Sequence, residues 1–391
     1  MTLPLPDISE QKYSDTLTAI LRDRILHADG WISFTDYMEI VLYTPEIGYY
    51  SGGAAKFGAA GDFVTAPEIS PLFGQVLARQ VASVLQSMHH GSILEFGAGS
   101  GKLAVELLLT LEALGALPEY YNILDLSADL QQRQRTLVEQ KIPHLAARIK
   151  WLSTLPEQFN GLILANEVLD AMPVHLVVWQ NDHIAERGLA WKNHKLIWQD
   201  KPLTEGALFD VARLLPPSDP SSCPHPYISE ISLANRHFIR SLAALLQQGV
   251  ILLIDYGFGQ NEYYHPQRQQ GTLMCHYRHH AHDDPFFLPG LQDITSHVDF
   301  SAIAQTALDS GLQLAGYTTQ AHFLINCGIT DLLARIPADQ PKDYLPLVSQ
   351  VQQLINPAEM GELFKVMALS KNINSDRAAY GFMRGDLRRL L

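Results

Sequence analysis

The chain has 391 residues, of which 47% are hydrophobic and 18% are charged, and its formal net charge is −13. This length is enough for two or three packed units, and the composition is ordinary for a globular enzyme. The negative charge argues against a nucleic-acid partner, because binding to phosphates requires a basic surface. The cysteines Cys223, Cys275 and Cys327 form no CxxC pair, so neither a zinc knuckle nor a disulfide framework is expected.

The first ten residues lack the basic region and the apolar core of a signal peptide. No stretch approaches 18 uninterrupted apolar residues, so we expect no membrane span. These features, together with the isolated cysteines, predict a reducing, cytoplasmic setting.

Helical patterns dominate the N-terminal part of the chain. Residues 14–28 read as an amphipathic helix. Ser70 followed by Pro71 is typical of a helix start, and the apolar spacing behind it predicts a helix to about Met88 that packs on a sheet. Between these helices, residues 51–61 are rich in glycine and alanine and are interpreted as a mobile loop.

Strands and helices then alternate, which is typical of a parallel sheet with helices on both faces. The predicted strands of this sheet are 93–96, 121–126, 149–152, 162–165, 250–256, 312–317 and 364–369. The predicted helices are 102–114, 131–140, 230–248 and 299–309, with a mostly helical stretch from 320 to 357. Residues 175–198 alternate with period two and predict inserted antiparallel strands, whereas 216–226 and 259–296 read as loops.

The most informative segment, Glu95-Phe96-Gly97-Ala98-Gly99-Ser100-Gly101, joins the first strand to the helix after it. Glycine lets the backbone turn sharply and lets a ligand approach without a Cβ in the way. Such a turn at the carboxyl end of the first strand of an open α/β sheet indicates a nucleotide-type ligand. The simpler alternative is a tight strand–helix turn without a ligand.

Three ligands compete for this turn. A P-loop needs glycine where Phe96 stands and serine or threonine where Leu103 stands. A dinucleotide fingerprint needs a glycine at Lys102, and Asp125, the acid after the second strand, comes later than the spacing of about 20 residues expected for NAD. S-adenosylmethionine fits better, because it has no pyrophosphate, its ribose can be held by Asp125, and its sulfonium favours acidic or aromatic surroundings.

A family resemblance is carried by seven segments, which are 43–50, 61–70, 95–101, 166–173, 229–232, 254–257 and 293–300. On these segments, the chain resembles the MidA-like, or mitochondrial complex I assembly factor, family of S-adenosylmethionine-dependent methyltransferases. The resemblance implies an α/β fold with a seven-stranded, Rossmann-like methyltransferase sheet whose last two strands are antiparallel. One departure is Asp125, where the family usually has glutamate.

The pattern and the resemblance together predict four regions. They are an N-terminal helical region that covers the cofactor (1–90), the Rossmann-like cofactor-binding half (91–175), an inserted hairpin, loop and helix (176–249), and the remaining strands (250–391). The last region includes a substrate-facing loop at 259–298 and a helical insertion at 320–357.

The resemblance also implies the chemistry, since the mitochondrial relatives dimethylate an arginine on a subunit of respiratory complex I. A guanidinium is protonated at ordinary pH, so carboxylates must hold it and a base must take up a proton. We expect Glu167 to hold the substrate guanidinium and His297 to accept the proton. Asp170 and Glu230 are further catalytic candidates, and Asp255, Asp293 and Asp299 are weaker ones. The expected cofactor contacts are Gly61, Asp62, Phe63, Glu95, Gly97, Gly99, Gly101, Asp125 and Asn166.

Most of these acids also have a structural explanation. Asp299 is as good a helix N-cap as a catalytic acid, and Glu230 would be favourable at a helix start. The His-rich run 276–284 is interpreted as a lid or substrate-facing loop, because its spacing is not that of a helical zinc site. No metal is expected. The aromatic group Tyr37, Tyr43, Tyr49 and Tyr50 is interpreted as core.

Two other functions stay open: a small-molecule methyltransferase, and a non-catalytic assembly factor that keeps the fold. The expected partner is a protein that carries an arginine, and an oligomer is compatible with the sequence.

Overall fold

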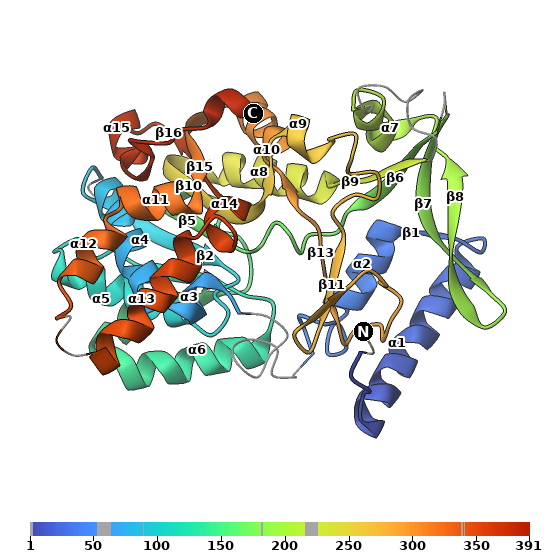
Figure 1. Cartoon of the computed structure of the whole chain (residues 1–391), viewed down its shortest axis with the longest axis horizontal. Coiled ribbons are helices and arrows are strands. Elements are labelled where there is room, and N and C mark those ends of the chain that lie inside the picture. Colours follow the sequence, from blue (N-terminus) through green and yellow to red (C-terminus); the bar gives the residue numbers. More distant parts are fainter. Residues whose placement is uncertain are drawn as a thin grey trace. The chain divides into compact units, whose positions relative to one another are not determined.

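A computed structural model of the chain describes residues 3–52, 64–88, 90–180, 183–215, 226–337, 339 and 341–391 (Figure 1). The chain divides into two compact units. The first comprises Met1–Phe63, Asp170–His237 and Gln260–His297. The second comprises Val64–Leu169, Phe238–Gly259 and Val298–Leu391. The expected cofactor contacts Gly61, Asp62 and Phe63 lie outside the described residues, as does most of each predicted loop at 51–61 and 216–226.

The second unit is built on an eight-stranded sheet. Seven strands follow one another in the order β15-β16-β10-β5-β2-β3-β4, and β14 pairs with β10 beside that path. The strands β10, β5, β2, β3 and β4 are parallel, whereas β16 is antiparallel to both β10 and β15. The two final strands are therefore antiparallel to each other, and β16 alone runs against the body of the sheet. The bounds are β2 (Ser92–Phe96), β3 (Tyr121–Leu124), β4 (Ile149–Leu152), β5 (Phe159–Asn166), β10 (Leu246–Phe258), β14 (Val298–Asp299), β15 (Gln313–Thr319) and β16 (Phe364–Lys371).

Helices cover both faces of this sheet (Figure 1). Ile93 of β2 belongs to the apolar cluster with α4 (Pro71–Leu85) and α5 (Lys102–Ala113), and Leu94 belongs to the cluster with α8 (Leu233–Leu245) and α10 (Phe300–Asp309). Successive side chains of a strand point to opposite faces, which explains this division. The other helices of the unit are α3 (Ala66–Ile69), α6 (Ala128–Lys141), α11 (Gln320–Asn326), α12 (Ile329–Ala334), α13 (Pro341–Ile355), α14 (Met360–Leu363) and α15 (Ser375–Ala378), with 3-10 turns at Pro143–Arg148, Tyr380–Phe382 and Arg388–Leu390.

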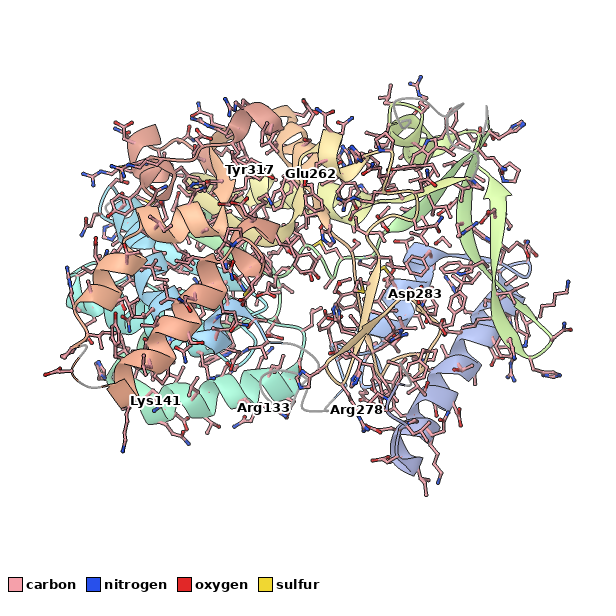
Figure 2. All side chains as sticks on the ribbon, in the orientation of Figure 1. Arg133, Lys141, Glu262, Arg278, Asp283 and Tyr317 are labelled. Atoms are coloured by element: carbon pink, nitrogen blue, oxygen red, sulfur yellow. The ribbon has the colours of Figure 1, made fainter. Side chains whose placement is uncertain are left out.

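Helix α6 shows how the helical period separates core from solvent. It buries Gln134 and Val138, whereas Arg133 and Lys141 are exposed (Figure 2). Val138 packs in the apolar core, and Gln134 is used for hydrogen bonds beside the glycine turn. A buried polar side chain on a helix needs such partners.

The first unit has a second sheet and its own core. Its five strands are antiparallel, in the order β1-β7-β6-β9 with β8 beside β7. The period-two alternation of residues 175–198 predicted the strands β6, β7 and β8, but neither β1 nor β9. Leu17, Leu21 and Met38 lie in the core of this unit. The bounds are α1 (Ile8–His27), β1 (Ile32–Ser33), α2 (Phe34–Tyr43), β6 (His175–Gln180), β7 (His183–Lys192), β8 (Lys195–Pro202), α7 (Gly206–Ala212) and β9 (Tyr227–Ile231).

Two stretches of the first unit differ from the prediction. Glu230 lies in β9 and not at the start of a helix, because residues 227–231 pair with β6; α8 begins only at Leu233. The stretch 259–296, predicted to be irregular, contains a small sheet in the order β12-β11-β13. Strands this short have little periodicity of their own, so pairing decides them. The bounds are α9 (Gln260–Tyr263), β11 (Met274–Tyr277), β12 (His280–His282) and β13 (Asp293–Thr295).

Across the described ranges, no helix combines the length and the apolar character that a bilayer crossing requires.

Candidate active site

The glycine turn connects β2 to α5. Gly97, Gly99 and Gly101 have φ values of 60°, 53° and 84°, which residues with a Cβ rarely adopt. A Cβ on Gly97 would lie 3.4 Å from Val168, and one on Gly101 would lie 3.1 Å from Gln134. A Cβ on Gly99 would meet no atom of the described residues within 4 Å. The middle of the turn therefore leaves its backbone open to a ligand.

Asp125, which follows β3, is fixed beside this turn. Its carboxylate accepts hydrogen bonds from the Ser127 amide at 3.0 Å and from Gln134 Nε2 at 3.0 Å. Gln134 Nε2 also donates to the Gly99 carbonyl oxygen at 2.9 Å, while its Oε1 accepts from Trp151 Nε1 at 2.9 Å. Burial raises the pKa of Asp125, and hydrogen bonds from Ser127, Gln134 and Gly99 oppose that rise. A carboxylate held in this way can accept hydrogen bonds from ribose hydroxyls at a defined position.

Glu95 in β2 is buried, with 2% of its surface exposed. Its Oε2 accepts a hydrogen bond from the Tyr121 hydroxyl at 2.9 Å. Burial raises the pKa of Glu95 from 4.5 to about 8, against the opposing effect of the Tyr121 hydrogen bond. The side chain is therefore mostly protonated at neutral pH, and it acts as a neutral acid within the sheet.

This raised pKa predicts that the native protein loses stability as the pH rises from about 5 to about 8. Within that window the folded chain keeps a proton that the unfolded chain releases, so unfolding becomes easier by up to roughly 1.4 kcal/mol per pH unit. In Glu95→Gln we expect this contribution to be absent. Urea unfolding of both proteins at pH 5, 6, 7 and 8 checks the prediction. Parallel stability curves for the two proteins would contradict it.

Asn166 and Glu167 stand at the carboxyl end of β5. Asn166 Nδ2 donates to Glu167 Oε1 at 3.2 Å, and Asn166 Oδ1 is buried with no hydrogen-bond partner among the described residues. Glu167 has a φ of 53°, and its amide donates to the Ile254 carbonyl oxygen at 2.8 Å. Its Oε1 also accepts from the Ala66 amide at 3.4 Å. Strained backbone and unsatisfied buried acceptors of this kind concentrate at functional sites.

Asp255 in β10 holds the loop that follows Glu167. It is fully buried, and its Oδ2 accepts hydrogen bonds from the amides of Val168 at 3.2 Å and Leu169 at 2.9 Å. These contacts explain Asp255 as the group that orders this loop. Its weaker candidacy as a catalytic acid stays a prediction.

Glu68 is a residue of this site that the sequence analysis did not select. It accepts a hydrogen bond from the Ser100 hydroxyl of the glycine turn and forms an ion pair with Lys102 at 2.5 Å. These contacts tie α3 to the glycine turn. No local pattern indicates them, because the partners lie 32 and 34 residues away in the chain.

In the first unit, Glu230 has many protein partners. Its carboxylate accepts from the amides of Thr272 at 2.9 Å and Leu273 at 3.0 Å, from the Thr272 hydroxyl at 3.1 Å and from the Tyr263 hydroxyl at 3.3 Å. Burial raises the pKa of Glu230, and the hydrogen bonds from Thr272 and Leu273 oppose the rise. This arrangement explains Glu230 as the residue that fastens β9 to the chain at 263–273. Its catalytic role stays a prediction.

Asp170 and Asp293 are grouped in the first unit with Tyr43 and Tyr50. The Tyr50 hydroxyl donates to Asp293 Oδ1 at 2.7 Å, and the Tyr43 hydroxyl donates to the Ala171 carbonyl oxygen at 2.8 Å. The two tyrosine rings are stacked, with centroids 5.5 Å apart and planes at 25°. Burial and then the charges of Asp170 and Asp293 raise the pKa of both phenols. These distant segments thus bring two acids and two rings together.

His297 and Asp299 lie on either side of the boundary between the two units, and each is described within its own unit. The His297 amide donates to Thr272 Oγ1 at 3.0 Å, and its carbonyl oxygen accepts from the Tyr263 hydroxyl at 3.1 Å. Asp299 Oδ1 accepts from the Ala302 amide at 3.1 Å, so Asp299 is the N-cap of α10. The structural explanation of Asp299 is confirmed.

The His-rich run forms a hairpin and not a loop. Cys275, His276 and Tyr277 of β11 pair with residues of β12, and Arg278 and His279 make the turn with positive φ values. Arg278, which is labelled in Figure 2, forms an ion pair with Glu10 at 2.7 Å. Within the described residues, no group of three or more His, Cys, Asp or Glu side chains is arranged to hold a metal.

Comparison with known proteins decides the family. The family model described as "Putative S-adenosyl-L-methionine-dependent methyltransferase" matches residues 76–318. The chain belongs to this family, the MidA-like methyltransferases. It is similar over 100% of both chains to a Burkholderia thailandensis protein crystallised with S-adenosyl-homocysteine, with 49% identity and a TM-score of 0.94.

Eukaryotic proteins also match this MidA-like chain. The Drosophila melanogaster protein named protein arginine methyltransferase NDUFAF7 homolog, mitochondrial, is 28% identical over 90% of this chain and 84% of its own length. The Danio rerio protein arginine methyltransferase NDUFAF7, mitochondrial, is 27% identical over 96% of this chain and 92% of its own length.

S-adenosylmethionine is the cofactor of this MidA-like methyltransferase, and the chemistry of the second unit suits it. The backbone at Gly99 is open, Asp125 offers a fixed carboxylate, and Asn166 Oδ1 is a buried acceptor without a partner among the described residues. These three features stand at the carboxyl ends of the neighbouring parallel strands β2, β3 and β5. Open α/β sheets bind their ligands at that edge.

Proposed function

We propose that this MidA-like methyltransferase is a protein arginine N-methyltransferase. The observation that carries the proposal is the alignment of relatives named as protein arginine methyltransferases along nearly the whole chain, including 96% of it for the Danio rerio protein. A net charge of −13 is compatible with a cationic substrate.

The proposed cofactor contacts follow from the second unit. We assign the amino-acid part of S-adenosylmethionine to the turn at Gly97, Gly99 and Gly101, the ribose to Asp125, and a further polar contact to Asn166. Glu95 then supports the turn from within β2, and Gly61–Phe63 are proposed to cover the cofactor. When bound, S-adenosylmethionine would supply the methyl group of its sulfonium for an in-line displacement, in which S-adenosylhomocysteine is the leaving group.

The protein has three tasks in this reaction: it must hold the substrate guanidinium, exclude water and remove a proton. In the transfer, a new N–CH3 bond forms on the guanidinium as the C–S bond breaks, and one N–H proton must leave the methylated nitrogen. We assign the hold on the guanidinium to Glu167, which has a left-handed backbone at the end of β5 and whose Oε1 accepts hydrogen bonds from Asn166 and Ala66. His297 is the proposed proton acceptor, and Asp170 and Glu230 stay secondary candidates.

The experiment that tests this function is mass spectrometry of the proteome of the source cells with and without the gene. We expect at least one methylarginine peptide to disappear on deletion, to return with the wild-type gene and to stay absent with Glu167→Gln. An unchanged methylarginine profile would contradict the proposal. If the methylarginine profile is unchanged, calorimetry separates the two other functions. Tight S-adenosylmethionine binding would then favour a methyltransferase for a small molecule, and no binding would favour a non-catalytic assembly factor.

A further inference from the structure

We propose that the first unit contains a binding site for the guanidinium group of the substrate, formed by Tyr43, Tyr50, Asp170, Asp293 and Thr295. The inference rests on the proposed function in that it takes the substrate to be an arginine. In place of Glu167 alone, it names groups of the first unit that recognise the guanidinium, two of which are tyrosines interpreted from the sequence as core.

The first part of the argument is the arrangement of the acids and rings. Asp293 accepts a hydrogen bond from Tyr50 at 2.7 Å, which orients one carboxylate oxygen. Tyr43 is held by the Ala171 carbonyl oxygen, next to Asp170 in the chain. Asp170 and Asp293 are 6% and 2% exposed, so both acids stand in surroundings that strengthen attraction to a cation.

Thr295 supplies an independent observation. Its Oγ1 is buried and has no hydrogen-bond partner among the described residues. Thr295 and Asp293 are two positions apart in β13, so their side chains share one face of the strand, and Ile294 between them packs into the apolar core. The orphan hydroxyl is therefore on the side of the Asp293 carboxylate. Leaving a buried hydroxyl unsatisfied is costly, and a ligand that donates a hydrogen bond removes that cost.

The chemistry of the site favours a guanidinium over an ammonium. A guanidinium is planar, carries five N–H donors and stacks on aromatic rings, whereas an ammonium is a compact and strongly hydrated charge. The cluster offers two carboxylates, one hydroxyl acceptor and a pair of stacked phenol rings. Carboxylates bind the guanidinium fork through paired hydrogen bonds, and ring faces attract its charge.

The test measures guanidinium binding to the full chain in the presence of saturating S-adenosyl-homocysteine. The probe is N-acetyl-L-arginine methylamide, followed by saturation-transfer NMR, with N-acetyl-L-lysine methylamide as the ammonium control. We expect the arginine probe to bind better than the lysine probe, and Asp293→Asn to weaken its affinity about tenfold or more. Asp210→Asn, an exposed acid of the same unit, is the matched control and should leave the affinity unchanged.

Thr295→Val separates a binding role from a structural one. It removes an orphan hydroxyl while keeping the shape, so the melting temperature should stay the same or rise. We expect the same change to weaken arginine-probe affinity several-fold, which a structural role does not predict. If Asp293→Asn does not fold, Tyr50→Phe provides a milder variant of the same site. Tyr50→Phe and Asp293→Asn should each bind S-adenosylmethionine within twofold of the wild-type affinity.

Equal binding of the two probes, or unchanged arginine affinity in folded Asp293→Asn and in Thr295→Val, would overturn this site. Its failure is distinguishable from failure of the proposed function. Methylarginine that depends on the gene and returns fully with Asp293→Asn rejects the site and keeps the function. Probe binding that depends on Asp293 and Thr295, without any gene-dependent methylarginine, supports the site and rejects the function.

Discussion

Gly99→Val is expected to weaken S-adenosylmethionine binding at least about 100-fold, which corresponds to ~2.7 kcal/mol. Gly99 has a φ of 53°, and a Cβ at this position would meet no atom of the described residues within 4 Å. The Cβ of the valine therefore clashes with no described protein atom, but the side chain occupies the space in which we place the cofactor. Isothermal titration calorimetry of the purified variant measures the loss directly.

Gly115→Val is the matched control for this experiment. Gly115 follows α5 and has a φ of 63°, and a Cβ added there would likewise meet no described atom within 4 Å. Both variants carry the same cost of placing a β-branched residue in the left-handed region, about 1–2 kcal/mol. Only Gly99→Val should lose cofactor affinity. If the two variants bind S-adenosylmethionine equally well, the proposed position of the cofactor is wrong.

Glu167→Gln is expected to reduce methyl transfer about 10²- to 10⁴-fold while cofactor affinity stays within a few-fold of the wild type. The amide oxygen of glutamine can still accept hydrogen bonds from Asn166 and Ala66, which are the contacts of Glu167 Oε1. The fold of the β5 end should therefore survive. What is lost is the negative charge that holds the guanidinium. Single-turnover transfer of a labelled methyl group to the substrate identified by mass spectrometry measures the effect.

Glu46→Gln is the matched control, because it also replaces a glutamate with a positive φ by glutamine. Glu46 also has a positive φ, of 69°, but it is exposed and lies outside the proposed site. It should retain full turnover. Unchanged turnover in Glu167→Gln would remove Glu167 from the mechanism, and a loss of cofactor binding in that variant would instead assign Glu167 to the cofactor site.

The glycine turn and the acids beside it could be predicted because each depends on a few neighbouring residues. Gly97, Gly99 and Gly101 do adopt the left-handed backbone that only glycine adopts readily. Asp125 and Asn166 come at the ends of strands that the apolar runs predicted, and parallel strands bring such ends to one edge. Most residues of the proposed cofactor site could therefore be predicted from short stretches of neighbouring sequence.

The secondary structure and the partners of Glu230 could not be predicted from the neighbouring sequence. Its acidic side chain before an apolar run predicted a helix start, but pairing with β6 places it in a strand. Its partners Thr272 and Leu273 are more than 40 residues away. Strand pairing and buried hydrogen bonds between distant segments decide such a position, and no pattern within a short window contains them.

The sequence by itself determined the methyltransferase family, the positions along the chain of seven strands of the large sheet, and the turn proposed to hold the cofactor. These features follow from short apolar runs, from glycine and from motifs that remain contiguous. Only the tertiary structure decided which acids meet which partners: Asp255 orders the loop after Glu167, Glu68 ties α3 to the glycine turn, and Tyr50 meets Asp293. The physical reason is that a side-chain contact depends on how distant segments pack, and chain order does not specify that packing.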